Sequence, residues 1–256
     1  MSMDTKVIKV NPEMFDDGEL KEACEILKRN GLVAFPTETV YGLGGDGMHK
    51  EASAKIYAAK GRPSDNPLIV HIADIEALYK LSCEVPDKAL KLADKFWPGP
   101  LTMILKKSDI VPDSITGGLG TVAIRMPSHK VAAELIRTSG VYIAKENVPM
   151  STTGGLETVA VRMPSHPVAR ELIRQSGVYI AAPSANTSGR PSPTKAEHVI
   201  EDLSGKIDMI IDGGSVGIGL ESTIVDMSED IPVILRPGYI TKEMLENVVG
   251  EVKVDP

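Results

Sequence analysis

The sequence predicts an α/β (α+β) fold, a twisted mixed sheet with flanking helices. Short apolar segments, typical of buried strands, alternate along the chain with longer segments of helical period. Several apolar segments end in Pro, Ser, Thr or Arg, which indicates polar loops gathered at one edge of the sheet. The 256 residues, 42% of them hydrophobic, suffice for one large domain with its own core. We therefore expect residues 1–256 to form a single domain.

The N-terminal half begins with an amphipathic helix at 16–31, capped by Asp16 or Asp17 and with Cys24 on its apolar face. The following elements are expected in this order: a strand at 32–36, a loop at 36–47, a helix at 50–60, a strand at 68–72, helices at 74–82 and 87–96, and a strand at 101–106. After the middle region we expect a strand at 178–184, a helix at 194–203, strands at 208–212, 222–226 and 232–236, and a helix at 241–249.

Residues 111–144 and 148–181 are two copies of one segment. At an offset of 37 residues, 27 of 34 aligned positions are identical, and each copy reads as loop, strand, helix, strand. Two copies are too few for a solenoid, so they indicate a tandem duplication. Only the second copy continues directly into the segment APSANTSGRPSPT, so we expect it in the functional position, with 111–147 inserted in a loop. The opposite arrangement, with the first copy in the sheet, stays open because the copies are so alike.

Charge and composition exclude several classes of protein. A formal net charge of −7 disfavours a surface that binds nucleic acid throughout, while a local basic cleft is compatible with it. Cys24 and Cys83 lie at apolar helical positions without metal-ligand spacing, so we expect buried thiols in a reducing compartment. The first residues lack a signal-peptide core, and no apolar run approaches the roughly 20 residues of a membrane span. These features predict a cytoplasmic protein with no membrane partner.

Two of four polar clusters lie in the N-terminal half. Residues 36–47 combine threonine hydroxyls with glycines that permit close backbone approach, although a plain strand-to-helix turn has the same composition. In the second cluster, Lys60 and Arg62 follow each other closely at a predicted helix end, with Asn66 and His71 after them. Two fixed cations suit a polyphosphate, whereas a solvated helix end is the plainer explanation. A lone His71 is more often a satisfied sheet residue than a ligand-binding one.

The other two clusters lie in the C-terminal half. Residues 182–194 gather Ser184, Ser192 and further hydroxyl and amide side chains before a predicted helix, an arrangement that suits an anion. Ser222 begins one predicted strand, and Arg236 ends another just before Pro-Gly. An arginine there indicates an anionic partner, unless it forms only a surface salt bridge.

The missing motifs narrow the chemistry. The chain has no GxxxxGK[ST] loop, no dinucleotide-binding GxGxxG between strand and helix, no HExxH and no Cys/His metal set. Cations, hydroxyls and amides are present, but no nucleophile–base pair is apparent. This inventory favours a reaction that depends on positioning and on charge stabilisation at a phosphate.

The four clusters, in this order, resemble the YrdC-like family of threonylcarbamoyl-AMP synthases. The matching strings include FPTETVYGLGGD, KGRPSDNPLIVHI, TVAVRMPSH, APSANTSGRPSPT, GLESTIVD and ILRPG, and they cover the chain from about Gly31 to Arg236. The resemblance implies a YrdC-like fold with a deep cationic cavity. It implies a nucleotidyltransferase that converts L-threonine, bicarbonate and ATP to threonylcarbamoyl-AMP and pyrophosphate, with Mg²⁺ carried on the ATP phosphates. Partner proteins would then transfer the group to tRNA, and a weak contact with RNA is compatible with this role.

The same resemblance implies the site residues. Lys60 and Arg62 are expected to be catalytic. The ATP-binding set is Arg62, Asn66, Thr158, Ser184, Ser192 and Arg236. The threonine-binding set is Thr39, His71, Arg162, Ala182 and Ser222. Arg162 would pair with the carboxylate of threonine. The duplication places Arg125 in competition with Arg162, and Thr121 in competition with Thr158. Thr37 remains an alternative to Thr39.

The sequence is also compatible with other functions. The main alternative is an RNA- or nucleotide-binding module of the same fold without synthase activity. A related carbamoyl-transferring maturation domain would normally sit in a much larger chain with cysteine sets that are missing here. A third hypothesis is that the duplication has inactivated the synthase. Because the chain ends at Pro256, it resembles the single-domain members of the family or a chain that stops before the linker of longer members.

Overall fold

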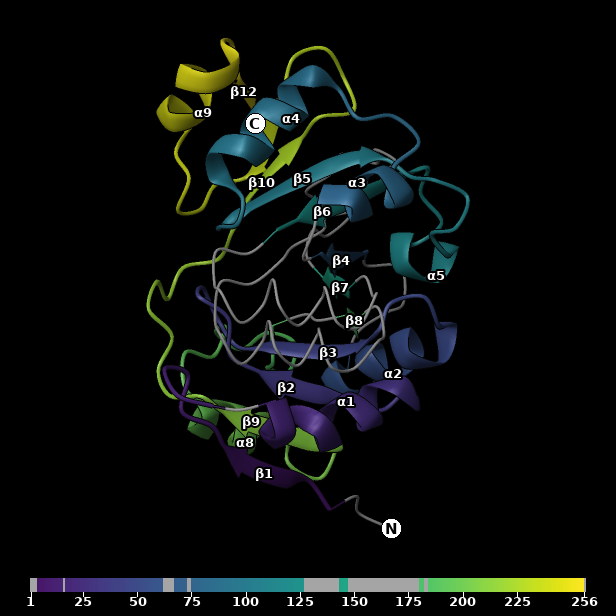
Figure 1. Cartoon of the computed structure of the whole chain (residues 1–256), viewed down its shortest axis with the longest axis vertical. Coiled ribbons are helices and arrows are strands. Elements are labelled where there is room, and N and C mark those ends of the chain that lie inside the picture. Colours follow the sequence, from purple (N-terminus) through teal and green to yellow (C-terminus); the bar gives the residue numbers. More distant parts are fainter. Residues whose placement is uncertain are drawn as a thin grey trace.

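The computed structural model describes residues 4–15, 17–61, 67–72, 75–126, 143–146, 180–181 and 184–255. Its strands form a mixed sheet along the long axis of the molecule, from β1 near the N-terminus to β12 near the C-terminus (Figure 1). The strand order is β1-β9-β2-β3-β7-β4-β6-β5-β10-β11-β12, and β8 pairs with β3 and β4 beside this path. The strands are β1 (Lys6–Lys9), β2 (Val33–Phe35), β3 (Gly42–Asp46), β4 (Leu68–His71), β5 (Leu101–Lys106), β6 (Thr121–Arg125), β7 (Ile143–Glu146), β8 (Ile180–Ala181), β9 (Met209–Asp212), β10 (Thr223–Asp226), β11 (Val233–Arg236) and β12 (Lys253–Val254).

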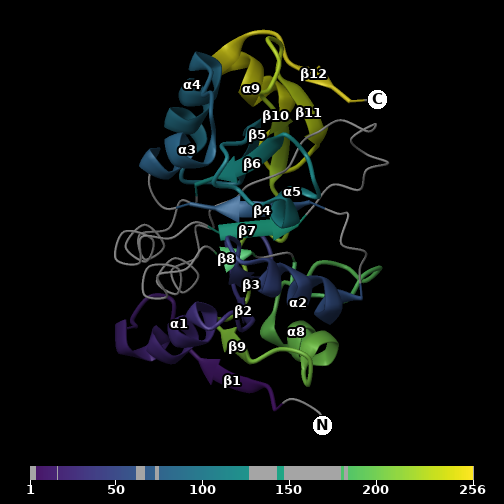
Figure 2. The ribbon, with the colours of Figure 1, turned by 90° about the vertical axis from the view of Figure 1, so that its right-hand side faces the viewer.

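Helices cover both faces of this sheet. The helices are η1 (Asp17–Leu20), α1 (Lys21–Lys28), α2 (Lys50–Lys60), α3 (Ile75–Leu81), α4 (Asp87–Phe96), α5 (Asp113–Thr116), α8 (Ala196–Leu203) and α9 (Lys242–Val249). In Figure 2, α1, α3 and α4 lie on one side of the sheet, and α2, α5 and α8 lie on the other. Helix α1 buries an apolar stripe made of Ala23, Cys24, Ile26 and Leu27. The predicted mixed sheet with flanking helices is confirmed.

Strand β3 lies where the sequence predicts a loop. Glycines are depleted in strands, which is why GLGGD does not read as one. Here the glycines serve close packing, since a Cβ on Gly45 would lie 2.9 Å from Leu32 Cδ2 and 3.3 Å from Ala52 Cβ. The missing side chain lets α2 pack directly against β3, and this contact sets the position of the helix end that carries Lys60.

Two smaller expectations in the N-terminal half are wrong. The N-cap of α1 is Leu20, which makes no side-chain cap hydrogen bond, because the 3-10 turn η1 precedes the helix. Asp17 therefore does not occupy the N-cap position of α1, and Asp16 lies outside the described residues. Cys24 is buried as predicted, but Cys83 is exposed because α3 has already ended before it.

Both copies of the repeat contribute strands. Strand β6 (Thr121–Arg125), from the first copy, lies between β4 and β5. The expected insertion of 111–147 in a loop is therefore wrong for the described residues 121–125 and 143–146, which lie in the sheet. The last strands of the copies share a register, because Ile143 of β7 and Ile180 of β8 both pair with Asp46. Those two residues are 37 positions apart, the offset of the repeat. The copies are thus equivalent in register, while 147–179 lie outside the described residues.

Two negative findings concern the described part of the chain. None of its helices combines the length and the apolar character that crossing a lipid bilayer requires. Within the same ranges, His, Cys, Asp and Glu side chains form no group of three or more that could hold a metal ion. The expected cytoplasmic location stays a prediction.

Candidate active site

The loop between β2 and β3 is organised by Thr37. Its hydroxyl donates to the carbonyl of Val40 at 2.6 Å and accepts the backbone N–H groups of Thr39 and Val40, each at 3.3 Å. The two threonine hydroxyls lie 3.1 Å apart. Because Thr37 gives its hydrogen to Val40, Thr39 is the donor in that contact, and its lone pairs remain for a ligand that donates. This division of roles favours Thr39 over Thr37 as the ligand-binding hydroxyl.

Lys60, at the end of α2, holds the loop that follows β8. Its buried ammonium donates to the carbonyl of Ser184, to the carbonyl of Asn186 at 2.9 Å and to Asn186 Oδ1 at 3.4 Å. The backbone N–H of Ser188 returns a hydrogen bond to the carbonyl of Lys60 at 3.1 Å. Ser184 also bridges to Gly42 at the start of β3. Lys60 therefore fixes the Ser-Ala-Asn loop against the sheet. The sequence predicts a different role for it, which is to bind phosphate.

We expect Lys60→Met to destabilise the protein by about 2–4 kcal/mol, because several buried carbonyl oxygens lose their donor. Urea denaturation measures the change in the free energy of unfolding. Lys55→Met is the matched control: Lys55 lies on the same helix and donates to the carbonyl of Asn30 at 2.7 Å, but at the surface. The control should change the free energy by less than about 1 kcal/mol. Equal effects of the two substitutions would contradict the assigned role of Lys60.

His71, at the end of β4, is completely buried. Its Nδ1 lies 3.4 Å from the carbonyl oxygen of Ile69. In the parallel pairing of β4 with β6, His71 is in register with Arg125 of the first copy. Thr121, at the other end of β6, is buried and in register with Lys106 of β5. The structure therefore places the first-copy residues Thr121 and Arg125 on a strand beside β4.

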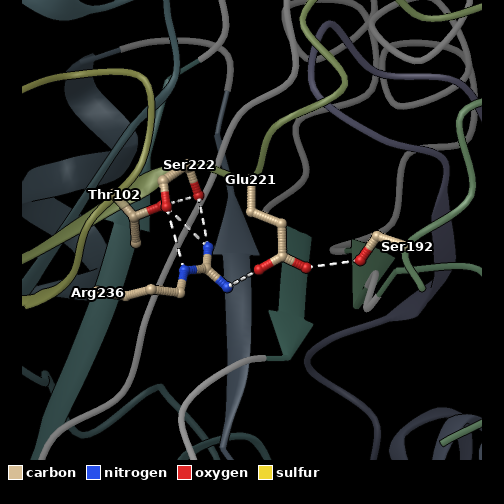
Figure 3. A network of polar contacts seen from close by, with 5 residues as sticks. All are labelled: Thr102, Ser192, Glu221, Ser222 and Arg236. Atoms are coloured by element: carbon tan, nitrogen blue, oxygen red, sulfur yellow. Dashed lines mark hydrogen bonds and ion pairs between the residues drawn. The ribbon is translucent and has the colours of Figure 1, made fainter. Parts of the chain in front are cut away.

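Arg236, at the end of β11, is the centre of a polar cluster (Figure 3). Its Nε and Nη2 donate to the carbonyl of Ser222 at 3.2 and 2.9 Å, and Nη2 also reaches Ser222 Oγ at 3.1 Å. Its Nη1 donates to Glu221 Oε2 at 2.5 Å. Ser192 Oγ donates to the other oxygen of the same carboxylate at 2.6 Å. Ser222 Oγ lies 3.0 Å from Thr102 Oγ1, so this cluster joins β5, β11, the residues just before β10 and the 184–195 loop.

Strand pairing explains why these residues meet. Strand β10 pairs in parallel with β5 and antiparallel with β11, which brings the beginning of β10 next to the end of β11. The side chains of Arg236 and Glu221 are 18% and 26% exposed, so the ion pair is accessible from one side. Burial lowers the pKa of the Arg236 guanidinium, and the Glu221 carboxylate opposes that shift. A partly desolvated guanidinium beside hydroxyl groups suits an anionic ligand.

The structure thus describes seven of the predicted site residues: Thr39, Lys60, His71, Ser184, Ser192, Ser222 and Arg236. It brings Ser192, Ser222 and Arg236 into one cluster, and Lys60 and Ser184 into another. The remaining predicted residues, Arg62, Asn66, Thr158, Arg162 and Ala182, lie outside the described ranges and stay predictions.

Sequence reasoning missed two members of the Arg236 cluster. Glu221 reads as an ordinary solvated charge, and Thr102 reads as an ordinary β-branched strand residue. The one available signal for Glu221 was its place directly before Ser222. A carboxylate next to a proposed anion site needs a cation, and Arg236 supplies it.

Comparisons with known proteins identify the family of this chain. The family Sua5_yciO_yrdC, described as telomere recombination, matches residues 25–145 and again 141–238. The threonylcarbamoyl-AMP synthase of Bacillus subtilis (strain 168) is 50% identical over 241 residues, which cover 94% of this chain and 59% of that protein. A putative threonylcarbamoyl-AMP synthase of Mycobacterium tuberculosis is 31% identical over 240 residues, 94% of this chain and 93% of that protein.

A solved structure also indicates the Sua5/YciO/YrdC family. The crystal structure of Pyrococcus abyssi Sua5 complexed with L-threonine is 46% identical, with a TM-score of 0.81 over 98% of this chain and 63% of that one. The chain therefore spans about three fifths of the length of the B. subtilis and P. abyssi proteins. The predicted YrdC-like fold is confirmed. The chain belongs to the Sua5/YciO/YrdC family.

Proposed function

We propose that the chain is an L-threonylcarbamoyladenylate synthase, which converts L-threonine, bicarbonate and ATP to threonylcarbamoyl-AMP and pyrophosphate. The observation that carries this proposal is the 50% identity to the B. subtilis threonylcarbamoyl-AMP synthase over 94% of the chain. The likeness to the threonine-complexed P. abyssi Sua5 supports L-threonine as a substrate. The product would supply the proteins that install threonylcarbamoyl-adenosine in tRNA.

The proposed chemistry needs positioning and charge more than a protein nucleophile. The amine of threonine forms a bond to the carbon of bicarbonate and becomes an N-carboxylate, and the displaced oxygen leaves as water with the proton of the amine. One oxygen of that carboxylate attacks the α-phosphorus of ATP in line, and pyrophosphate leaves with the electron pair of the broken P–O bond. Negative charge grows on the phosphate oxygens during this step, and fixed cations stabilise it. Mg²⁺ would arrive on the ATP phosphates, as part of the substrate.

The Arg236 cluster and the loop held by Lys60 have different roles in this proposal. Arg236, together with Arg62, would stabilise charge on the phosphates. Lys60 would act through the loop that it holds, so that Ser184 meets the nucleotide in a fixed position. Asn66 and Thr158 complete the proposed ATP site, with Thr121 as the first-copy equivalent of the latter.

The threonine side of the site would use Thr39, whose lone pairs suit the amine, with His71, Ser222 and Ala182. An arginine would bind the carboxylate of threonine. The register that pairs His71 with Arg125 supports the first-copy arginine in this role over Arg162, which the sequence alone favours. Removing a charged partner of this kind costs roughly 2–5 kcal/mol of binding.

Pyrophosphate release by the purified chain tests the proposed function. With ATP, threonine and bicarbonate all present, we expect turnover; omission of either threonine or bicarbonate should reduce pyrophosphate release to background. A binding module of the same fold would bind ATP but release no pyrophosphate under any of these conditions. Pyrophosphate release that is indifferent to threonine would also refute the proposal.

A further inference from the structure

The Arg236 cluster contains one hydroxyl whose hydrogen is already committed. Ser192 Oγ donates to Glu221 Oε1 at 2.6 Å, while Glu221 Oε2 accepts from Arg236 at 2.5 Å. Figure 3 shows Glu221 between the two, with one carboxylate oxygen directed at each. A carboxylate paired with a guanidinium only accepts hydrogen bonds, so Ser192 has to be the donor. Glu221 therefore sets the direction of the Ser192 hydroxyl.

A serine hydroxyl has one hydrogen and two lone pairs. With its hydrogen on Glu221, Ser192 offers only lone pairs to a ligand. Phosphate oxygens of ATP likewise only accept, so Ser192 in this state does not bond to them. The donors on ATP are the amino group of adenine and the two ribose hydroxyls, and all three belong to the nucleoside.

The residues around Ser192 suit the uncharged nucleoside part of ATP. Ser192 lines a cavity of about 330 Å³ together with Arg190, Pro191, Thr194, His198, Glu201 and Asp202. Arg190 pairs with Asp202 at 2.6 Å, which neutralises the cation of this cavity, and Glu201 adds a carboxylate to its wall. Such a lining repels a triphosphate and tolerates an uncharged nucleoside.

We propose that Glu221 is a specificity-determining residue that makes Ser192 a hydrogen-bond acceptor for a donor on the nucleoside of ATP. This rests on the proposed function, which supplies ATP as the ligand. Ser192 then distinguishes nucleotides by a hydroxyl or amino group and contributes nothing to phosphate binding. Arg236, on the other oxygen of Glu221, remains on the phosphate side of the cluster. Glu221 thus lies where the nucleoside and phosphate parts of the site meet.

Direct binding measurements test this inference. Calorimetric titrations compare ATP with 2′-deoxy-ATP, 3′-deoxy-ATP, purine riboside triphosphate (which lacks the amino group) and inorganic tripolyphosphate. The wild-type chain should bind one of the three nucleoside analogues about tenfold more weakly than ATP, the effect of one lost hydrogen bond. Which analogue it is identifies the donor that Ser192 reads.

The variants then locate the cause. Ser192→Ala should bind ATP as weakly as that analogue, with its affinity for tripolyphosphate unchanged. Glu221→Gln should remove most of the discrimination while keeping the shape of the side chain, because an amide N–H donates to Ser192 and releases the hydroxyl hydrogen. Ser204→Ala, at the exposed end of α8, and Glu84→Gln, in a surface ion pair with Lys106, are the matched controls and should behave as wild type.

Two outcomes overturn the inference while leaving the proposed function intact. In one, the wild-type chain binds all three analogues as tightly as ATP. In the other, Ser192→Ala weakens tripolyphosphate as much as ATP, which would place Ser192 on the phosphates. A wild-type chain that binds neither ATP nor tripolyphosphate overturns the proposed function, and with it the inference.

Discussion

Replacing Gly238 by alanine should disrupt the Arg236 cluster and destabilise the protein by about 3 kcal/mol. A Cβ at this position would lie 2.5 Å from the carbonyl oxygen of Glu221, 2.5 Å from the backbone nitrogen of Thr223 and 2.6 Å from the carbonyl carbon of Ser222. All three are backbone atoms, so no side chain can turn aside. The turn after β11 would have to move away from the start of β10, and Arg236 would move with it.

The substitution should affect function as well as stability. Displacing Arg236 from Ser222 and Glu221 by even a fraction of an ångström should lower pyrophosphate release at least tenfold. Urea denaturation and the pyrophosphate assay measure the two effects. Gly217→Ala is the matched control, because a Cβ there meets no atom within 4 Å. It should change the free energy of unfolding by no more than about 0.5 kcal/mol. A Gly238→Ala protein as stable and active as this control would contradict the assigned packing.

Arg125→Ala should raise the KM for threonine by roughly thirtyfold or more, the effect of losing a charged partner for a carboxylate. The reason is the register of β6, in which Arg125 lies beside His71. Arg162→Ala is the matched control from the second copy and should change this KM by less than threefold. Steady-state pyrophosphate release at varied threonine concentration measures both.

The double variant completes this comparison. If the first copy alone supplies the arginine, Arg125→Ala with Arg162→Ala should behave like Arg125→Ala by itself. A strong effect of Arg162→Ala alone would instead place the second copy in the site, as the unbroken connection to the Ser-Ala-Asn loop suggests. Weak single effects with a strong double effect would show that either copy serves, which the shared register of Ile143 and Ile180 with Asp46 makes structurally reasonable.

The alternation of apolar and amphipathic segments predicted most of the fold, because burial of one face sets the period of each element. The helix at 87–96, which buries Ala89, Leu92 and Ala93 at helical spacing, follows this rule closely. Strand β3 does not, because its position depends on what packs against Gly45 from other parts of the chain. No local pattern carries that information. The position of β6 is hidden for another reason: two nearly identical segments have the same local preferences.

The site shows a similar division. Residue type and order were enough to select Ser192, Ser222 and Arg236, which the structure brings together. Residue type and order could not show that the Lys60 ammonium donates to the carbonyl groups of a loop, since those carbonyls lie 124 and 126 positions away in the sequence. The role of Glu221 could not be predicted because it depends on two hydrogen-bond donors, Ser192 and Arg236, which reach its carboxylate from separate segments of the chain.

We expect the chain to join threonine, bicarbonate and ATP in one adenylate. The most direct measurement follows ¹⁴C-labelled bicarbonate in a reaction with threonine and ATP and identifies the nucleotide products by mass spectrometry. We expect a labelled product that contains both AMP and threonine and forms in equal amount to pyrophosphate. Release of pyrophosphate or phosphate from ATP with no bicarbonate carbon in any nucleotide product would contradict it.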